Sequence, residues 1–414
     1  MSSASALRAY HAYASDRWDA LVAAHSLLVR GQVHSGLRSF RDVLPSLPYL
    51  LGGEPHAWPP FSASPHDASV SSALVYLRDF FQLTKTWKLL PTFIGPIKNA
   101  PEYPALPAAI RAQIEAGYGL SQAGSLPHDD IISGMQHLLS EVASDASPDG
   151  QWARIVLQLA LSEANNRALR STMAIHHAQA ALALTPPGTP YYAIRAYEEI
   201  ANAYYDAATI NDDDDDQYDH ALDAYNRADA IVDQIGPEAW PMSRDYDKGW
   251  LFCRRNDFAL AVEHFERAAL RRSGAGLLYD AGRSYYGMGY ALLNLDRHDA
   301  ARASLHRALD LFSDDDHEQL NQDALGLGSR SPLMLGRALQ ILGLVDQDQG
   351  DFKSALDNLE LSREHLLAVT DPGPWFDTLV PLIEVCRALN RPDKLAYYES
   401  ELAALRTRFD LPKS

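Results

Sequence analysis

Five adjacent aspartates, Asp212 to Asp216, are the residues that most invite a chemical interpretation. Divalent cations such as calcium take oxygen ligands, but an EF-hand loop needs alternating ligands, a glycine and a distant glutamate. The run has none of that spacing. Because adjacent like charges repel and stay exposed, the run is typical of a solvated insertion loop between helices. Binding of a cation or of a basic partner stays open for this loop. Asp314 to Asp316 has the same interpretation, with a basic partner as the alternative.

The histidines and cysteines are not spaced to hold a metal ion. His176 and His177 are adjacent, so on a helix their side chains would point about 100° apart and could not face one ion together. Cys253 and Cys386 are too few for a disulfide framework or a thiolate metal site. We therefore predict no metal site and no cofactor. Two cysteines also fit a reducing cytoplasm.

The common catalytic signatures are missing from the sequence. It has no Gly-rich loop ending in Gly-Lys-Ser/Thr, no Gly-x-Ser-x-Gly, no His-Glu-x-x-His and no Cys-x-x-Cys. This argues against phosphate-binding, serine-hydrolase and zinc enzymes. We expect a protein that is not an enzyme, with an unrecognised helical-repeat enzyme as the weaker alternative.

Charge and hydropathy narrow the class of partner. The 414 residues include 36 Lys+Arg and 54 Asp+Glu, a formal net charge of −18. Such an acidic surface repels a phosphate backbone, so we expect no direct nucleic-acid binding. The longest uncharged stretch, 171–194, contains two histidines and a Pro-Pro-Gly breaker, so no membrane helix is expected. The N-terminus has no secretory signal pattern, and we predict a cytoplasmic location, with organellar targeting as the weaker alternative because the N-terminus is Ser-rich and poor in acidic residues.

A pattern of small and large residues repeats through the C-terminal two-thirds of the chain. Segments 256–268, 296–308 and 350–362 each begin with a polar or Gly turn and continue with small, large and small residues at i, i+4 and i+7. This is the spacing of one helical face. A glycine precedes the first small residue of each segment by twelve positions: Gly249 before Ala261, Gly289 before Ala301 and Gly343 before Ala355.

This pattern resembles the tetratricopeptide repeat (TPR), a helix–turn–helix unit of about 34 residues. In that family small residues let the two helices of a unit touch, because larger side chains would hold the backbones apart. Units start near residues 155, 194, 242, 282 and 336. The resemblance implies an all-α fold, a right-handed α-solenoid of about seven to nine helix pairs. Since these units are spaced more widely than in the family, we expect longer helices or ordered linkers between them.

The strength of the repeat pattern suggests three regions. Residues 1–109 form an irregular N-terminal helical region with one or two degenerate repeats, at 17–50 and 71–104. Residues 110–375 form the TPR-like array. Residues 376–414 form a C-terminal capping helix pair, because Ile383 and Leu395 stand where small residues belong.

In the family that the sequence resembles, the first helix of each unit lines a concave groove. Its lining positions correspond here to Glu163, Asn166, Arg167, Arg195, Glu198, Asn202, Tyr205, Tyr246, Trp250, Arg254, Arg283, Tyr286, Tyr290, Asn294, Arg337 and Gln340. Planar donors, rigid aromatic rings and amides are typical of recognition surfaces. At these positions we expect side chains that have no packing role within their own unit. The resemblance then makes them candidate ligand-binding residues.

These observations favour a non-catalytic scaffold that binds a peptide or protein segment in the concave groove. The alternative is a peptide- or ligand-sensing regulatory protein of the TPR type, whose solenoid changes pitch when the groove is filled. Neither reading involves a membrane. The identity of the partner, the pathway, the oligomeric state and any conformational change stay open.

Overall fold

The structure, a computed structural model, describes residues 103–105, 107–122, 126–210, 214–236, 244–274, 278–313, 332–368 and 373–409, with a few positions between 20 and 30. The chain divides into two compact units, Met1–Pro241 (unit 1) and Met242–Ser414 (unit 2). All regular secondary structure in the described residues is helical, which confirms the all-α prediction. The boundaries expected at 109/110 and 375/376 stay predictions.

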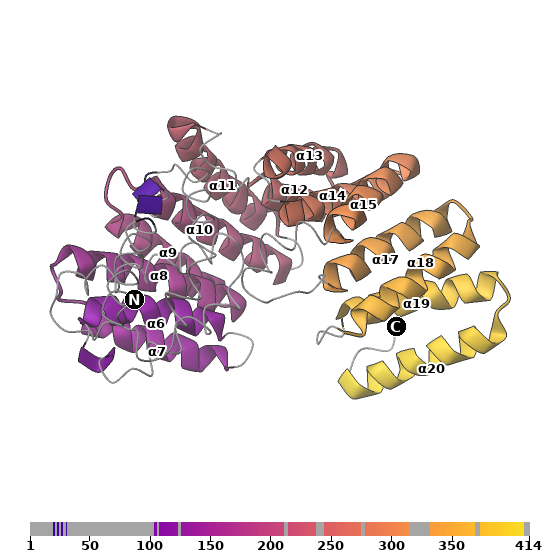
Figure 1. Cartoon of the computed structure of the whole chain (residues 1–414), viewed down its shortest axis with the longest axis horizontal. Helices are drawn as coiled ribbons and strands as arrows, with labels where there is room; N and C mark the ends of the chain where they lie inside the picture. Colours follow the sequence, from indigo (N-terminus) through magenta and orange to yellow (C-terminus); the bar gives the residue numbers. More distant parts are fainter. Residues whose placement is uncertain are drawn as a thin grey trace, which may run out of the picture. The chain divides into compact units, whose positions relative to one another are not determined.

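Unit 1 contains three helix pairs within its described residues (Figure 1). They follow the short 3-10 helix η3 Tyr103–Ala105 and are α6 Ala108–Ser121 with α7 His128–Glu141, α8 Pro148–Arg167 with α9 Ser171–Leu184, and α10 Pro190–Ile210 with α11 Asp215–Ile235. The start of α8 shows how the sequence sets a boundary. Ser147 accepts a hydrogen bond from the backbone N–H of Gly150 at 3.0 Å, and Pro148 occupies the first helical position.

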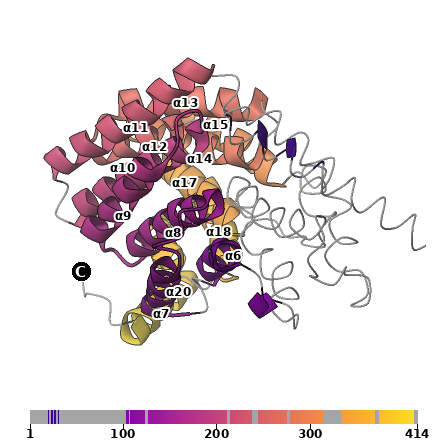
Figure 2. The ribbon, with the colours of Figure 1, turned by 90° about the vertical axis from the view of Figure 1, so that its left-hand side faces the viewer.

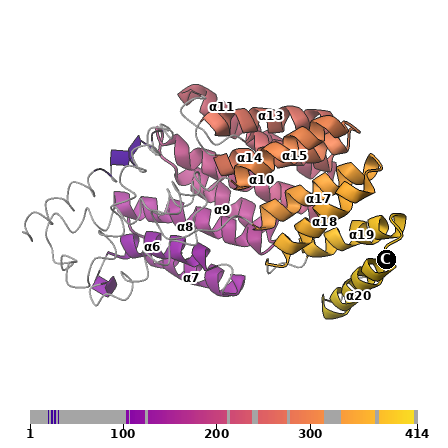
Figure 3. The ribbon, with the colours of Figure 1, turned by 45° about the vertical axis from the view of Figure 1, so that its right-hand side comes forward.

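Unit 2 contains four helix pairs within its described residues. They are α12 Asp245–Arg254 with α13 Phe258–Gly274, α14 Leu278–Leu293 with α15 His298–Ser313, α17 Pro332–Asp348 with α18 Phe352–Leu366, and α19 Gly373–Ala388 with α20 Pro392–Phe409. From α14 to α20 the helices follow one another in the order of the sequence (Figure 3). Both units together give seven described pairs, inside the predicted range.

Within each unit the pairs stack in the manner of a helical-repeat protein. We call the two members of a pair its first helix and its second helix. Each second helix packs on its own first helix and, inside the unit, on the first helix of the next pair. First helices of successive pairs also contact one another, and Figure 2 shows α8 between α6 and α10. Every first helix therefore contributes to one continuous layer within its unit.

Glycines mark the closest helix contacts, at the positions that the repeat pattern predicts. A Cβ atom on Gly249 would lie 2.7 Å from Cε1 of Phe265, which is too close for a non-bonded contact. The equivalent glycines Gly289 and Gly343 meet Cγ of Leu305 and of Leu359, each at 2.6 Å. A large residue of the second helix thus fills the space that a missing side chain leaves on the first.

The turn inside five of the pairs has the same geometry. One residue adopts a positive φ of 50–76° in each: Leu169, Asn256, Asp296, Gly350 and Asn390. The backbone N–H of the next residue then bonds the carbonyl five positions earlier, as Arg170 does with Asn165 at 2.8 Å. This is the Schellman arrangement that ends many helices. Because all five residues are the fifteenth of their units, the turn confirms the starts near 155, 242, 282 and 336 and shows the same register at 376.

The aspartate run is only partly the loop that the sequence predicts. Asp215 and Asp216 lie in the first turn of α11, and Asp214 caps that helix by accepting from the backbone N–H of Asp216 at 3.0 Å. The loop interpretation is therefore wrong for Asp215 and Asp216, because carboxylates are stabilised at a helix N-terminus, whereas Asp214 precedes the helix as its cap. Asp212, Asp213 and the run 314–316 lie outside the described residues. So do nearly all of the weak repeats at 17–50 and 71–104.

The helix pair predicted at 376–414 corresponds to α19 and α20, which contact each other directly, and its capping role stays a prediction. Ile383 and Leu395 take the places of small residues and pack in one hydrophobic cluster. Polar contacts hold α20 as well. Nε of Arg363 on α18 donates to both carboxylate oxygens of Glu401, at 3.1 and 3.0 Å, and the indole of Trp375 donates to the same carboxylate at 2.9 Å. In this pair, hydrophobic packing and ion pairing hold the helices together, whereas glycines mark the helix contacts of other pairs.

Candidate functional site

The sixteen candidate residues all lie on first helices, except for Asn294, which directly follows α14. Seven belong to unit 1: Glu163, Asn166 and Arg167 on α8, and Arg195, Glu198, Asn202 and Tyr205 on α10. Nine belong to unit 2: Tyr246, Trp250 and Arg254 on α12, Arg283, Tyr286, Tyr290 and Asn294 with α14, and Arg337 and Gln340 on α17.

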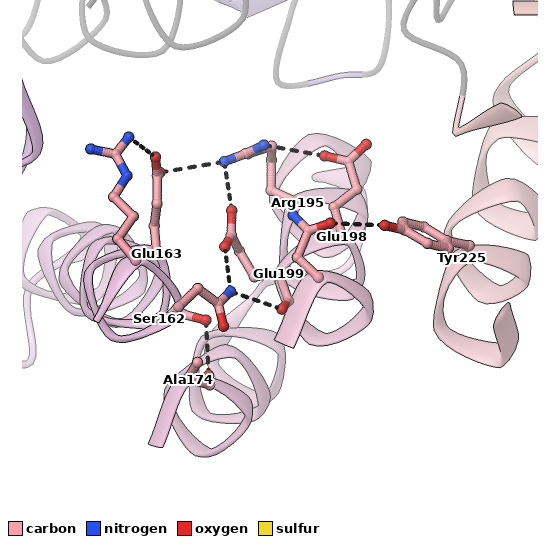
Figure 4. A network of polar contacts seen from close by, with 10 residues as sticks. Ser162, Glu163, Ala174, Arg195, Glu198, Glu199 and Tyr225 are labelled. Carbon is pink, nitrogen blue, oxygen red and sulfur yellow. Dashed lines mark hydrogen bonds and ion pairs between the residues drawn. The ribbon is translucent and has the colours of Figure 1, made fainter. Parts of the chain in front are cut away.

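In unit 1 most of the candidate residues bind one another (Figure 4). Arg195 donates to Glu199 at 3.0 Å and to Glu198 at 3.2 Å, and Glu163 lies 3.9 Å from it. Glu163 also accepts from Arg167 at 2.6 Å. The second carboxylate oxygen of Glu199 accepts from the Asn166 amide at 3.2 Å. Helices α8 and α10 are thereby joined by a shared polar network.

Arg195 is the centre of this network. Its side chain is 11% exposed, and that of Glu199 is 4% exposed. Burial alone would lower the pKa of Arg195, but the carboxylates of Glu199 and Glu198 raise it above its usual value. Both arginines of the set are already paired within the unit. This set is therefore suited to fixing one helix against the next.

Glu199 is a member of the network that the sequence analysis did not single out. Its position, four residues after Arg195, is the spacing at which side chains on a helix meet. That spacing was the available signal. Asn202 similarly ties α10 to α11, because it accepts a hydrogen bond from the hydroxyl of Tyr225 at 2.8 Å. Tyr205 packs against Tyr218 with ring centroids 5.8 Å apart.

In unit 2 the aromatic candidates form a cluster around the buried ring of Phe265. Trp250 lies 5.3 Å from Phe265 between ring centroids, 5.9 Å from Tyr286 and 5.6 Å from Tyr290. Two glycines make room for this ring, because a Cβ atom on Gly249 or Gly287 would lie within 2.7 Å of it. The cluster therefore joins α12, α13 and α14.

Tyr246 is held between the arginines of two helices. The guanidinium of Arg272 lies 4.5 Å from its ring centroid, and that of Arg283 lies 4.7 Å from it. Arg283 also donates to the Tyr246 hydroxyl at 3.2 Å and to Asp280 at 3.3 Å. Cation–π contacts and an ion pair within the protein itself therefore already occupy Tyr246 and Arg283. Burial would lower the pKa of Arg283, while Tyr246 and Asp280 raise it.

The expectation that the candidates have no packing role within their own unit is wrong for Tyr246 and Trp250, whose ring centroids lie 5.9 and 5.3 Å from that of Phe265 in the same pair. It is also wrong for Tyr205, which packs against Tyr218. Tyr246 and Tyr286 are each only 8% exposed. Burial raises the pKa of Tyr286 to about 12, which the nearby Arg337 partly offsets. The reason is that aromatic side chains of one first helix are long enough to fill the gap to the next. Tyr246 and Tyr286 therefore act as packing residues and not as accessible binding residues.

Other candidates of unit 2 remain accessible. Trp250, Tyr290, Arg337 and Gln340 are half-buried, and Arg254 and Asn294 are exposed. These residues lie on α12, on or directly after α14, and on α17. Helix α14 contacts both α12 and α17. We call these six residues the unit 2 face. It combines rigid aromatic surface with donors and acceptors for a polypeptide.

Within the described residues, no group of three or more His, Cys, Asp or Glu side chains is arranged to hold a metal ion. Cys253 and Cys386 are unpaired and buried. His177 lies in the core of its pair, with Nδ1 2.6 Å from the Gln158 side chain. No helix in the described part of the chain is both long and apolar enough to cross a bilayer.

No family model matches the sequence, and no curated protein is detectably similar to it. Several solved structures match its fold. A Rap protein complexed with competence and sporulation factor is 12% identical, with a TM-score of 0.54 over 95% of this chain and 98% of that chain. The apo form of RapI is 10% identical, with a TM-score of 0.51 over 72% of this chain and 98% of that chain. Aspartyl phosphate phosphatase F from Bacillus subtilis is 13% identical, with a TM-score of 0.47 over 95% of this chain and 94% of that chain.

The first two likenesses agree with the internal evidence from helix pairing, from glycines at the contacts and from the common turn. At these identities they bear on the fold alone. The chain has the fold of a TPR-like helical-repeat protein.

Proposed function

We propose that this chain is a non-catalytic interaction scaffold that binds a peptide or protein segment on the unit 2 face. The observation that carries the proposal is the accessible pair Trp250 and Tyr290, 5.6 Å apart between ring centroids and contributed by adjacent first helices. Buried neighbours fix both rings, so little side-chain entropy is lost when a ligand packs on them. The unit 2 face also carries the amides of Asn294 and Gln340, which are suited to a peptide backbone.

The unit 1 residues are assigned a supporting role in this proposal. Arg195 and Glu199 already satisfy each other at 3.0 Å, and a ligand would have to replace that contact to bind them. Binding of the protein or peptide partner is thus assigned to unit 2, and the proposal includes no direct binding of nucleic acid. A cytoplasmic location also belongs to the proposal, and the two unpaired cysteines are consistent with it.

Selection of random linear peptides displayed on phage tests the proposal. The full chain should enrich a set of related peptides, and Tyr290→Ala should weaken their binding at least tenfold by loss of aromatic contact area, about 1.4 kcal/mol or more. Tyr397→Ala is the matched control, since this tyrosine is 55% exposed on the second helix α20. Failure of the full chain to enrich any peptide, with the fold verified by circular dichroism, would contradict the proposal.

A second candidate function is peptide or ligand sensing with a regulatory output. The fold likeness over 95% of the chain to a Rap protein that was solved with competence and sporulation factor favours it. Small-angle scattering of the full chain, with and without an enriched peptide, separates the two functions. A sensor changes its radius of gyration when the peptide binds, whereas an unchanged radius supports a rigid scaffold.

A further inference from the structure

The same repeat position holds an arginine in three units. Arg195, Arg283 and Arg337 are each the second residue of units that start at 194, 282 and 336. The first two have carboxylate partners within one helical turn. Arg195 pairs with Glu198, three residues later, and Arg283 pairs with Asp280, three residues earlier. In both of these units the arginine at this repeat position therefore forms an ion pair with a nearby carboxylate.

Arg337 departs from that rule. The residue three positions earlier is Met334, where Arg283 has Asp280, and the residue three positions later is Gln340, where Arg195 has Glu198. Within the described residues no hydrogen bond or ion pair satisfies Arg337, and its electrostatic neighbour is the tyrosine Tyr286. Arg337 and Tyr286 stand at the repeat positions of Arg283 and Tyr246, but neither neighbouring position holds the carboxylate that Arg283 has.

A half-buried guanidinium that finds no counter-ion among the described residues is an unfavourable arrangement that an anionic group would relieve. We propose that Arg337 is the specificity residue of the unit 2 face and binds an acidic side chain, Asp or Glu, of an extended peptide. This inference rests on the proposed function and names its ligand class. Trp250 and Tyr290 lie on the adjoining helices α12 and α14, so the acidic residue of the ligand is flanked by an apolar one.

The position of Arg337 in unit 2 favours an internal acidic side chain over a terminal carboxylate. First helices adjoin α17 on both sides, α14 before it and α19 after it. An extended peptide can therefore continue past Arg337 in both directions. A chain end is not needed to place a carboxylate there.

The test uses the peptides that the full chain enriches from the displayed library, labelled and measured by fluorescence anisotropy. We expect a shared Asp or Glu whose replacement by Asn or Gln weakens binding about tenfold, the loss of one charge-assisted contact. Arg337→Gln should give the same loss, and the two changes together should cost no more than either alone. Arg307→Gln, at an exposed arginine on α15, should leave binding unchanged.

Gln340→Glu provides a second and conservative test. It places a carboxylate three residues after Arg337, the spacing at which Glu198 pairs with Arg195 at 3.2 Å. The variant should neutralise Arg337 internally and weaken acidic peptides about tenfold without lowering thermal stability.

The outcomes separate the inference from the function on which it rests. Peptides that need Tyr290 but bind Arg337→Gln, Gln340→Glu and the wild type equally would overturn the inference and leave the proposed function standing. Peptides that share no acidic residue, or a terminal carboxylate in place of an acidic side chain, would also overturn it. Absence of any enriched peptide would overturn both.

Discussion

At the scale of single residues, Leu169 is in an unfavourable backbone conformation. It has a φ of +57° and is 64% exposed. The same turn position holds asparagine, aspartate or glycine in the other four units, residues that tolerate this region. Leu169→Gly should therefore stabilise the protein by about 0.5–1 kcal/mol, because steric relief exceeds the entropy that glycine adds to the unfolded chain. Urea denaturation of the full chain measures the change.

The reverse substitution is the control for this prediction. Gly350 has a φ of +76°, and nothing lies within 4 Å of the position that an added Cβ atom would take, so Gly350→Ala changes backbone strain without a new contact. It should destabilise by about 1 kcal/mol. If Leu169→Gly also destabilises, the exposed leucine contributes packing that outweighs the strain.

Asp206 gives a prediction about pH. Burial raises the pKa of this carboxyl to about 6, against 3.8 as the ordinary value. The contribution of the Asp206 carboxyl to the free energy of unfolding is therefore fully present at pH values below its pKa in the unfolded chain. This contribution is lost as the pH rises through its pKa in the folded protein, near 6. Asp206→Asn should therefore raise Tm at pH 8 and leave it nearly unchanged at pH 4.

Asp145 serves as the opposite case. The hydrogen bond from Ser147 lowers the pKa of its carboxyl. Its ionised form is thus favoured by folding, and Asp145→Asn should give no gain of Tm at pH 8. An equal gain from both variants would point to net charge as the cause, since each removes one negative charge.

At the scale of helices, the glycine contacts make the packing testable. Phe265 of α13 lies against Gly249 of α12 and Gly287 of α14, and a Cβ atom on Gly287 would be 2.5 Å from its ring. Gly287→Ala should destabilise by about 1–3 kcal/mol, because the ring has to move in a filled core. Phe265→Leu in the same chain should recover part of that loss. Urea denaturation measures both variants.

Gly134→Ala is the matched control for a helix glycine without such a contact. Nothing lies within 4 Å of the added carbon, and the residue is inside α7. Alanine should stabilise this helix by about 0.5–1 kcal/mol. A similar loss from both glycine variants would mean that helix packing does not explain the role of Gly287.

Pairing within a repeat could be predicted from the sequence because it depends on residues close in the chain. Gly289 and Ala301 are twelve positions apart and belong to the two helices of one pair, so their spacing alone indicates the contact. The wider unit spacing also has a physical basis in α10 and α11, which are 21 residues each.

The candidate site was less predictable, because its side chains meet across helices. The repeat position of Tyr286 places it on a first helix, but its burial depends on Trp250, which lies 36 positions earlier in the sequence and 5.9 Å away between ring centroids. Similarly, no spacing rule shows that Glu163 lies 3.9 Å from Arg195. Position within the repeat therefore identified the layer, while the structure separates supporting from accessible residues.

At the scale of the whole molecule, the division into units 1–241 and 242–414 predicts how the chain unfolds. Repeat proteins are stabilised mainly by contacts between neighbouring pairs, so each unit has its own cooperative core. Calorimetry of the full chain should show two transitions. Gly287→Ala lies in unit 2 and should lower only one of them, while Leu169→Gly lies in unit 1 and should raise only the other.

An enriched peptide, if it binds the unit 2 face, should raise the transition that Gly287→Ala lowers, since a ligand stabilises the part of the protein that binds it. A single transition that all three changes shift together would show that the chain unfolds as one cooperative array.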